Sequence, residues 1–159
     1  RRRFHEELER VLNYSRRYSI HGALLFIDLD NFKYVNDTFG HQIGDELLVS
    51  ISDALKKMLR KSDILSRLGG DEFAVLLSQV DENQAICITK QMIETVHGKG
   101  MFTHNHSTDV TASIGIAFFP AHSDTANSLV SCADQAMYHA KEKGRNGYCV
   151  FSGQKNNKI

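Results

Sequence analysis

The sequence has few of the residues that mark a specialised protein class: no tryptophan, one proline and three cysteines among 159 residues. Cys87, Cys132 and Cys149 are odd in number, widely spaced and set in apolar surroundings. This spacing argues against a disulfide framework and favours reduced, buried thiols in a cytosolic protein. His104 and His106 have no third ligand nearby in the sequence, so we expect a solvated connection there rather than a metal site.

The sequence also has no excess of positive or negative residues. Lys plus Arg number 19 and Asp plus Glu number 19, so no global field draws the chain to nucleic acid or to an anionic membrane. No apolar run approaches the roughly 20 residues that a membrane helix needs, and the N-terminus does not have the pattern of a signal peptide. We expect a cytoplasmic piece without membrane contact of its own, although the parent protein can carry an anchor upstream.

Two kinds of hydrophobic pattern fill the rest of the sequence. Apolar residues at helical spacing predict amphipathic helices, and short apolar runs rich in β-branched and aromatic residues predict buried strands. The length suits a single domain over residues 1–159, with residues 154–159 as a frayed tail. We expect Gly98 and Gly100 to stop the third helix. The predicted helices cover residues 4–20, 44–60, 85–96 and 129–140, and the predicted strands cover residues 23–27, 63–68, 73–77, 110–119 and 148–151.

A pair of glycines near the middle of the chain joins two of the predicted strands. Gly69 and Gly70 lie between two apolar, β-prone segments, which predicts a β-hairpin. Glycine tolerates the positive φ of a tight turn and lets another molecule approach the backbone. The turn then presents two adjacent carboxylates, Asp71 and Glu72. These carboxylates form either an ordinary solvated hairpin tip or part of an acidic site.

The segment RLGGDEF resembles the signature of the GGDEF domain, the diguanylate cyclase family. Four further segments match that family in the expected order, from about residue 2 to residue 148: FIDLDNFKYVNDTFGHQIGDELL, RKSD, ASIGIA and ADQAMYHAKEKGRNGY. The resemblance implies an α/β (α+β) fold, the palm-like sandwich of nucleotide cyclases, with a mixed sheet of about five strands, an antiparallel centre and flanking helices. In the family a further motif precedes the first helix, so we expect a piece of a longer protein.

The acidic residues suit a divalent cation. Mg²⁺ takes oxygen ligands and keeps several waters, so one or two carboxylates plus substrate phosphates are enough to hold it. Asp28 ends a buried strand and Asp71 stands at the hairpin tip, and they converge if their strands are neighbours. The resemblance implies that both bind Mg²⁺, or Mn²⁺ in its place, with the backbone carbonyl of Leu29. Glu72 matches a position that assists the metal or takes a proton from the attacking hydroxyl. Without the resemblance, a helix N-cap is the favoured interpretation of Asp28.

Asn36 and Asp45 match the positions that recognise guanine. A carboxylate accepts from N1–H and the 2-amino group of guanine together, and an amide can donate and accept on the same edge. Adenine lacks the 2-amino group and would leave a buried carboxylate unpaired. We expect Gly40 and Gly44 to make room for the base. The simpler alternative is that Asn36 and Asp45 only cap a turn and a helix.

Three cations match the positions that hold the triphosphate: Lys33, Lys141 and Arg145. Lys141 and Arg145 also suit the C-terminal end of a helix, where the dipole favours positive charge. The match of the whole string AKEKGRNGY to the family is what implies phosphate binding. Gly69 and Gly70 join the same substrate site, since their bare backbone allows close approach.

The resemblance implies an enzyme that condenses two GTP into cyclic di-GMP and two pyrophosphates, mainly by positioning and charge stabilisation. One site holds one GTP, so a homodimer with apposed hairpins is needed, controlled from upstream. Arg60 and Asp63 match the family's product-inhibition site, where an arginine and an aspartate suit a guanine nucleotide. Lys90 would be a poorer substitute for the second arginine that often completes this site. A helix-end salt bridge is the simpler alternative.

Two other functions fit parts of the sequence. A catalytically silent domain of the same fold could bind GTP or cyclic di-GMP and only signal; loss of Asp28, Asp71 or Glu72 would mark it, and all three are present. A phosphorylation-dependent receiver domain also has acidic residues after its first strand, as Asp28 and Asp30 are here. Its regular alternation of strands and helices has no place for the central hairpin.

Overall fold

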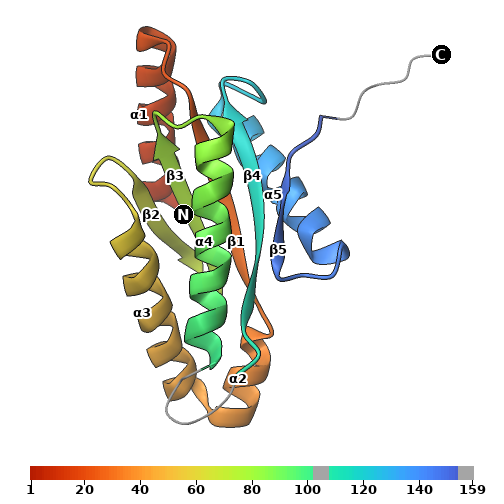
Figure 1. The fold of residues 1–159 in the computed structure, drawn as a ribbon. Coiled ribbons are helices and arrows are strands. Elements are labelled where there is room, and N and C mark those ends of the chain that lie inside the picture. Colours follow the sequence, from red (N-terminus) through yellow and green to blue (C-terminus); the bar gives the residue numbers. More distant parts are fainter. Residues whose placement is uncertain (102–107, 154–159) are drawn as a thin grey trace, which may run out of the picture.

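The computed structural model describes residues 1–101 and 108–153, and the predictions for His104, His106 and residues 154–159 lie outside these ranges. Within the described ranges the chain forms five helices and five strands (Figure 1). In chain order they are α1 Arg2–Tyr18, β1 Gly22–Asp30, α2 Phe32–Phe39, α3 His41–Met58, β2 Ile64–Gly69, β3 Glu72–Ser78, α4 Glu82–Met101, β4 Thr111–Phe119, α5 Ala126–Glu142 and β5 Gly147–Val150.

The strands form one sheet in the order β2-β3-β1-β4-β5. All neighbours are antiparallel except β4 and β5, which are parallel. This arrangement confirms the predicted mixed sheet with an antiparallel centre. It also excludes the receiver-domain alternative, because β2 and β3 form a direct antiparallel hairpin instead of being separated by a helix.

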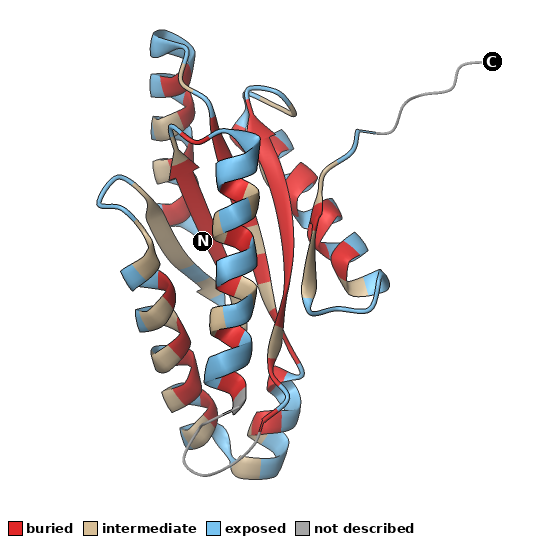
Figure 2. Ribbon diagram, in the orientation of Figure 1, coloured by how far each residue is buried: buried red, intermediate tan, exposed pale blue. Residues whose placement is uncertain are grey.

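Helices cover both faces of the sheet: α3 and α4 lie on one face, and α1 and α5 lie on the other (Figure 1). The strand β1 explains why two layers are needed, because its side chains alternate between the faces. Leu25 and Ile27 pack in the core cluster beneath α3 and α4, whereas Leu24 packs with Leu8 of α1 and Leu129 of α5. Most residues of β1, β3 and β4, the central strands of the sheet, are therefore buried (Figure 2).

Helix α5 approaches the sheet closely because both partners are small at their contact. Its buried face carries Ala133 and Ala136, and the facing strand β4 carries Gly115. A side chain added at Gly115 would overlap backbone atoms of Ala133 and Met137. The absence of a Cβ at this position is therefore what allows the helix to lie against the strand.

One helix was not predicted, and several element boundaries differ from the sequence predictions. Helix α2 was not predicted, since its eight residues bury only Phe32 and Val35, too few to make a helical pattern. Helix α3 begins at His41 rather than at Gly44. Helix α4 continues past Gly98 to Met101. A Cβ at Gly100 would meet the backbone of Val110, so this glycine serves close packing within the helix rather than stopping it.

The prediction of reduced, buried thiols is correct for two of the three cysteines. Cys132 and Cys149 are buried, but Cys87 is exposed, and all three are free. Cys87 lies on the solvent side of α4, between the buried residues Ala85 and Thr89, so its apolar neighbours in sequence point the other way. Within residues 1–101 and 108–153, none of the helices combines the length and the apolarity needed to cross a bilayer.

Candidate active site

The end of β1 meets the tip of the β2–β3 hairpin. The strand register places Asp28 directly opposite Glu72, and the backbone N–H of Leu29 donates to the carbonyl of Asp71 at 3.1 Å. The two strands are thus neighbours, as convergence of Asp28 and Asp71 requires. Asp28 lies inside β1, and the N-cap of α2 is Asn31, so the capping alternative for Asp28 is wrong.

The Asp28 side chain faces α5. Side chains two apart in a strand share a face, and Leu24 and Phe26 both belong to the cluster beneath α1 and α5. Lys141, in the last turn of α5, places its Nζ 2.9 Å from Oδ2 of Asp28. The C-terminal end of α5 therefore brings a cation onto the acidic end of β1.

Burial raises the pKa of the Asp28 carboxyl above its ordinary value. A hydrogen bond and the positive charge of Lys141 lower the pKa, while the nearby carboxylates of Asp71 and Asp30 raise it further. The balance disfavours the ionised form, because burial outweighs the single cation. A carboxylate in this situation gains from a second positive charge close by.

The hairpin tip is open and held by backbone contacts. Gly70 has φ +52, and a Cβ added to either Gly69 or Gly70 would meet nothing within 4 Å. These glycines therefore serve the turn conformation and leave space over the backbone. Arg67 Nε donates to the carbonyl of Gly70 at 2.9 Å and braces the turn.

Glu72 has a partner that the sequence did not suggest. Arg1 Nη2 lies 2.5 Å from Oε2 of Glu72, with side chains 72% and 35% exposed. Arg1 is the N-cap residue of α1, far from Glu72 in sequence, and no local pattern connects the two. The pair is accessible to water, so its stabilising contribution is small and the carboxylate stays available to a ligand.

Asn36 and Asp45 lie in α2 and α3, on either side of the turn at Gly40. The capping alternative is wrong for Asp45, because the N-cap of α3 is Gly40. Asn36 lies in the last turn of α2, where its backbone carbonyl accepts from the Gly40 N–H at 3.0 Å. A Cβ at Gly44 would overlap Oδ1 of Asn36. Gly44 thus makes room for the Asn36 amide, not directly for a base as expected. Asp45 is exposed beside it.

The three predicted phosphate-binding cations come from α2, from α5 and from the turn after α5. Lys33 is exposed in the first turn of α2, next to the end of β1, where the helix dipole favours anions. Lys141 contacts Asp28. Arg145 follows α5, is 59% exposed, and places Nε 4.0 Å from Oδ1 of Asp30.

The predicted product site is a turn at the other end of β2. Asp63 Oδ2 accepts from the backbone N–H of Arg60 at 2.9 Å, and the Asp63 N–H donates to the Arg60 carbonyl at 3.0 Å. Asp63 Oδ1 is buried without a hydrogen-bond partner. Arg60 is exposed, as is Lys90 on α4. The contact between Arg60 and Asp63 is therefore a backbone turn, not the side-chain salt bridge of the simpler alternative.

The residues present suit a magnesium ion that arrives with its substrate. Among the described residues, no group of three or more His, Cys, Asp or Glu side chains could enclose a metal. Asp28 and Asp71 interact closely enough for one carboxylate to raise the pKa of the other. Mg²⁺ keeps waters and takes phosphate oxygens, so two carboxylates and a carbonyl such as that of Leu29 are enough.

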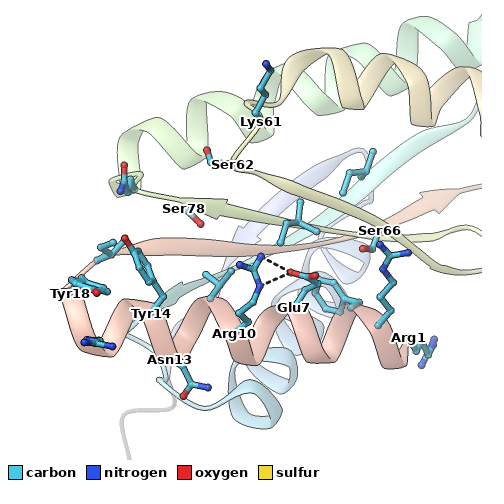
Figure 3. Close-up of a pocket in the computed structure, with 18 of the residues that line it drawn as sticks. Arg1, Glu7, Arg10, Asn13, Tyr14, Tyr18, Lys61, Ser62, Ser66 and Ser78 are labelled. Carbon is cyan, nitrogen blue, oxygen red and sulfur yellow. Dashed lines mark hydrogen bonds and ion pairs between the residues drawn. The ribbon is translucent and has the colours of Figure 1, made fainter.

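Two hollows flank this region on the α1 side of the sheet. The larger is a groove of about 1090 Å³ between α1 and β2 (Figure 3). Arg10 extends across it and pairs with Glu7, and Lys61 and Ser62 stand at its far wall (Figure 3). The smaller hollow, of about 810 Å³, includes Glu72. Only the smaller one is therefore continuous with the acidic cluster.

Known proteins resemble the chain over nearly its whole length. The family model for "Diguanylate cyclase, GGDEF domain" matches residues 1–147. The "Bifunctional diguanylate cyclase/cyclic di-GMP phosphodiesterase MucR" of Pseudomonas aeruginosa is 37% identical over 154 residues, which are 97% of this chain and 22% of MucR. The chain thus spans about a fifth of the length of this relative.

Solved structures agree in fold. The GGDEF domain of TpbB (YfiN) from Pseudomonas aeruginosa has a TM-score of 0.83 and 35% identity, covering 96% of this chain and 95% of that one. The GGDEF domain of DgcB from Caulobacter crescentus, in complex with c-di-GMP, has a TM-score of 0.85 and 27% identity, covering 94% and 89%. With its antiparallel hairpin, its acidic strand end and these matches, the chain belongs to the GGDEF domain family of diguanylate cyclases.

Proposed function

We propose that the protein is an active diguanylate cyclase, which condenses two GTP into cyclic di-GMP and two pyrophosphates. The observation that carries the proposal is the meeting of Asp28, Asp71 and Glu72 where β1 reaches the hairpin. A silent domain of the same family would be marked by the loss of one of these residues. All three are present, and Lys141 adds a cation beside them.

In this proposal the residues of the site share the work of an in-line attack of a 3′-hydroxyl on an α-phosphate. Asp28, Asp71 and the Leu29 carbonyl hold Mg²⁺, which supplies positive charge to the phosphates. Glu72 accepts the proton of the attacking hydroxyl or helps to hold the metal. The positive side chains of Lys33, Lys141 and Arg145 hold the triphosphate, and the open backbone of Gly69 and Gly70 allows its close approach.

Guanine is recognised at the junction of α2 and α3. Asp45 accepts from N1–H and the 2-amino group, and Asn36 completes the same edge of the base. The position of Asn36 against the backbone of Gly44 supports this role, because a fixed amide loses less freedom on binding. Asp45 is exposed in the free chain, so the penalty against adenine arises on binding: a base without a 2-amino group would cover the carboxylate without pairing it, at a cost of about 1–3 kcal/mol.

Catalysis needs two chains, since one site of this kind holds one GTP. Two copies therefore face each other with their hairpins apposed. Product binds at the turn of Arg60 and Asp63, where the exposed Arg60 side chain can stack on a guanine. Binding inhibits only if it favours an unproductive arrangement of the two chains.

The test is incubation of the purified protein with GTP and Mg²⁺, followed by separation of the nucleotides. We expect cyclic di-GMP and pyrophosphate, none of either with ATP or with EDTA, and a rate per chain that rises with protein concentration. Asp71→Asn is the matched inactive variant. Binding of GTP without any product would identify a silent signalling module instead.

A further inference from the structure

Asp30 has no role in the proposed reaction, yet the fold buries it completely. Among the described residues it is the only charged residue that is buried, with a side chain 1% exposed. Burying a carboxylate is unfavourable unless its oxygens are hydrogen-bonded or paired. The groups that contact Asp30 therefore indicate the role of this buried charge.

The contacts of Asp30 join three parts of the chain. Oδ1 accepts from the Ser113 hydroxyl at 2.8 Å, and Oδ2 accepts from the Thr111 hydroxyl at 2.8 Å, both in β4. Oδ2 also accepts from the backbone N–H of Asn146 at 3.1 Å. Arg145 Nε lies 4.0 Å from Oδ1. One carboxylate thus fixes the end of β1 to β4 and to the turn between α5 and β5.

That turn has a conformation that side chains rarely adopt. Gly144, Arg145 and Asn146 have φ of 113°, 63° and 43° in succession. A residue with a Cβ is disfavoured in this left-handed region, so a run of this kind persists only where the surroundings hold it. Three hydrogen bonds restrain it: the Asn146 N–H donates to Asp30, the Arg145 N–H donates to the Ala140 carbonyl at 3.2 Å, and the Gly144 N–H donates to the Lys141 carbonyl at 3.3 Å.

Two contacts of the same kind lie side by side. Asp28 and Asp30 are two apart in β1, a spacing of roughly 6.6 Å along a strand. Lys141 lies in the last turn of α5, and Arg145 lies in the turn that follows this helix. Asp28 therefore faces Lys141, and Asp30 faces Arg145. Only the second carboxylate is fully buried, so it is not available to a metal or a substrate.

We propose that Asp30 is a positioning residue, whose buried carboxylate holds the left-handed turn at residues 144–146 and thereby aims Arg145 at the phosphates of the nucleotide. This inference rests on the proposed function for the identity of the ligand. Asp30 itself does not contact the substrate. Arg145 faces Asp30 through its Nε, and its side chain is 59% exposed. The outer edge of the guanidinium is therefore available to bind an anion.

The first test is Asp30→Asn, which keeps the shape and removes the charge. We expect the KM for GTP to rise about tenfold, with a smaller change in kcat. The double variant Asp30→Asn/Arg145→Ala should have the KM of Arg145→Ala alone, because the two residues act through one group. Independent, additive effects on KM would overturn the proposal.

A second variant, Ser113→Ala, removes one hydrogen bond from the same carboxylate. It should raise the KM for GTP by less than Asp30→Asn does. It replaces Asp30→Asn if that variant does not fold.

The control is Thr89→Val, which removes a buried hydroxyl bonded to the Ala85 carbonyl at 2.8 Å in α4. It should lower the melting temperature without changing the KM for GTP. If it raises KM as much as Asp30→Asn does, the effect of Asp30 is general destabilisation and the proposal is wrong.

A second measurement does not depend on catalysis. The backbone amide of Asn146 should exchange its hydrogen at least about tenfold faster in Asp30→Asn than in the parent, while the amide of Thr89 in α4 keeps its rate. Unchanged exchange at Asn146 would show that Asp30 does not hold the turn. If the parent makes no cyclic di-GMP, the proposed function fails, and hydrogen exchange still decides the role of Asp30.

Discussion

The ammonium of Lys141 lies 2.9 Å from Asp28 Oδ2, yet the pKa of this carboxyl is still raised, because burial outweighs the attraction. Asp28 is therefore held in the folded chain in a charged state that its surroundings do not fully compensate. Sites that bind substrates or metals commonly carry such a cost, which disappears when the ligand supplies the missing charge.

The first prediction is that Asp28→Asn stabilises the metal-free protein at neutral pH. A carboxyl whose pKa is raised by folding contributes its stability below the ordinary value of 3.8 and loses it as the pH rises through the folded pKa. Asparagine stays neutral at every pH. The melting temperature of Asp28→Asn should therefore exceed that of the parent at pH 7, and the difference should shrink as the medium is acidified toward that value.

Thermal unfolding across this pH range measures the difference, with exposed Asp53→Asn in α3 as the control. GTP with Mg²⁺ should stabilise the parent and not Asp28→Asn, because only the parent retains the charge that the cation needs. A less stable Asp28→Asn at pH 7 would mean that the contact with Lys141 dominates after all.

The second prediction concerns Glu72→Gln. This change removes a charge from the edge of the hairpin and little packing. The free energy of unfolding should therefore stay within about 0.5 kcal/mol of the parent value. Product formation should fall by at least about a hundredfold, the usual contribution of a general base. The exposed Glu82→Gln in α4 serves as the control. Retained turnover in Glu72→Gln would place the chemistry elsewhere.

The third prediction concerns the choice of base. Asp45→Ala should weaken GTP binding and remove most of the preference for GTP over ATP, because the group that accepts from the 2-amino position is lost. Asp53→Ala, one exposed carboxylate further along α3, should change neither. Calorimetric titration with GTP and with ATP measures the ratio of the two affinities. Discrimination as sharp as in the parent would exclude Asp45 from base recognition.

The fourth prediction compares two glycines. Gly115→Ala should destabilise the protein by about 1–3 kcal/mol, because the new methyl group overlaps the backbone of α5. Gly98→Ala should stabilise it by about 0.5–1 kcal/mol, since that position lies in a helix with open space around it. Denaturant unfolding of both variants tests the contrast. Equal effects would mean that α5 can shift away from β4 at little cost.

The fifth prediction concerns feedback by the product. Cyclic di-GMP should bind the parent, and Arg60→Ala should bind it at least about tenfold more weakly, because a stacking and hydrogen-bonding group is lost. Inhibition should be weak, since Lys90 is a poorer partner than a second arginine. Calorimetry and turnover are measured together, with Lys61→Ala as the neighbouring control. Equal affinity of parent and Arg60→Ala would remove the site, and binding without reduced turnover would leave it without a regulatory role.

The sequence predicted the elements that long or distinctive patterns define. The runs around Gly69 and Gly70 required a hairpin, and the apolar run before Asp28 required a buried strand, so the acidic end of the sheet followed. Helix α2 escaped because it is too short for its periodicity to show. The exposure of Cys87 escaped because apolar neighbours in sequence do not tell which side of a helix faces solvent.

Contacts between distant segments could not be predicted at all. The pairing of Arg1 with Glu72 joins two residues 71 positions apart, and Asp30 contacts the turn that carries Arg145 from 116 positions away. Only the folded sheet brings these groups together. The tight fit of Asn36 against Gly44 likewise depends on the angle between two helices, which no local pattern specifies.

Strand β2 has a kinetic consequence. It runs for six residues from the turn of Arg60 and Asp63 to Gly69 at the hairpin tip, which is roughly 20 Å at the rise of an extended strand. A nucleotide at one end therefore does not compete for space with a nucleotide at the other end of the same chain. We expect cyclic di-GMP to lower the maximal velocity, and we expect that saturating amounts of GTP do not relieve this inhibition.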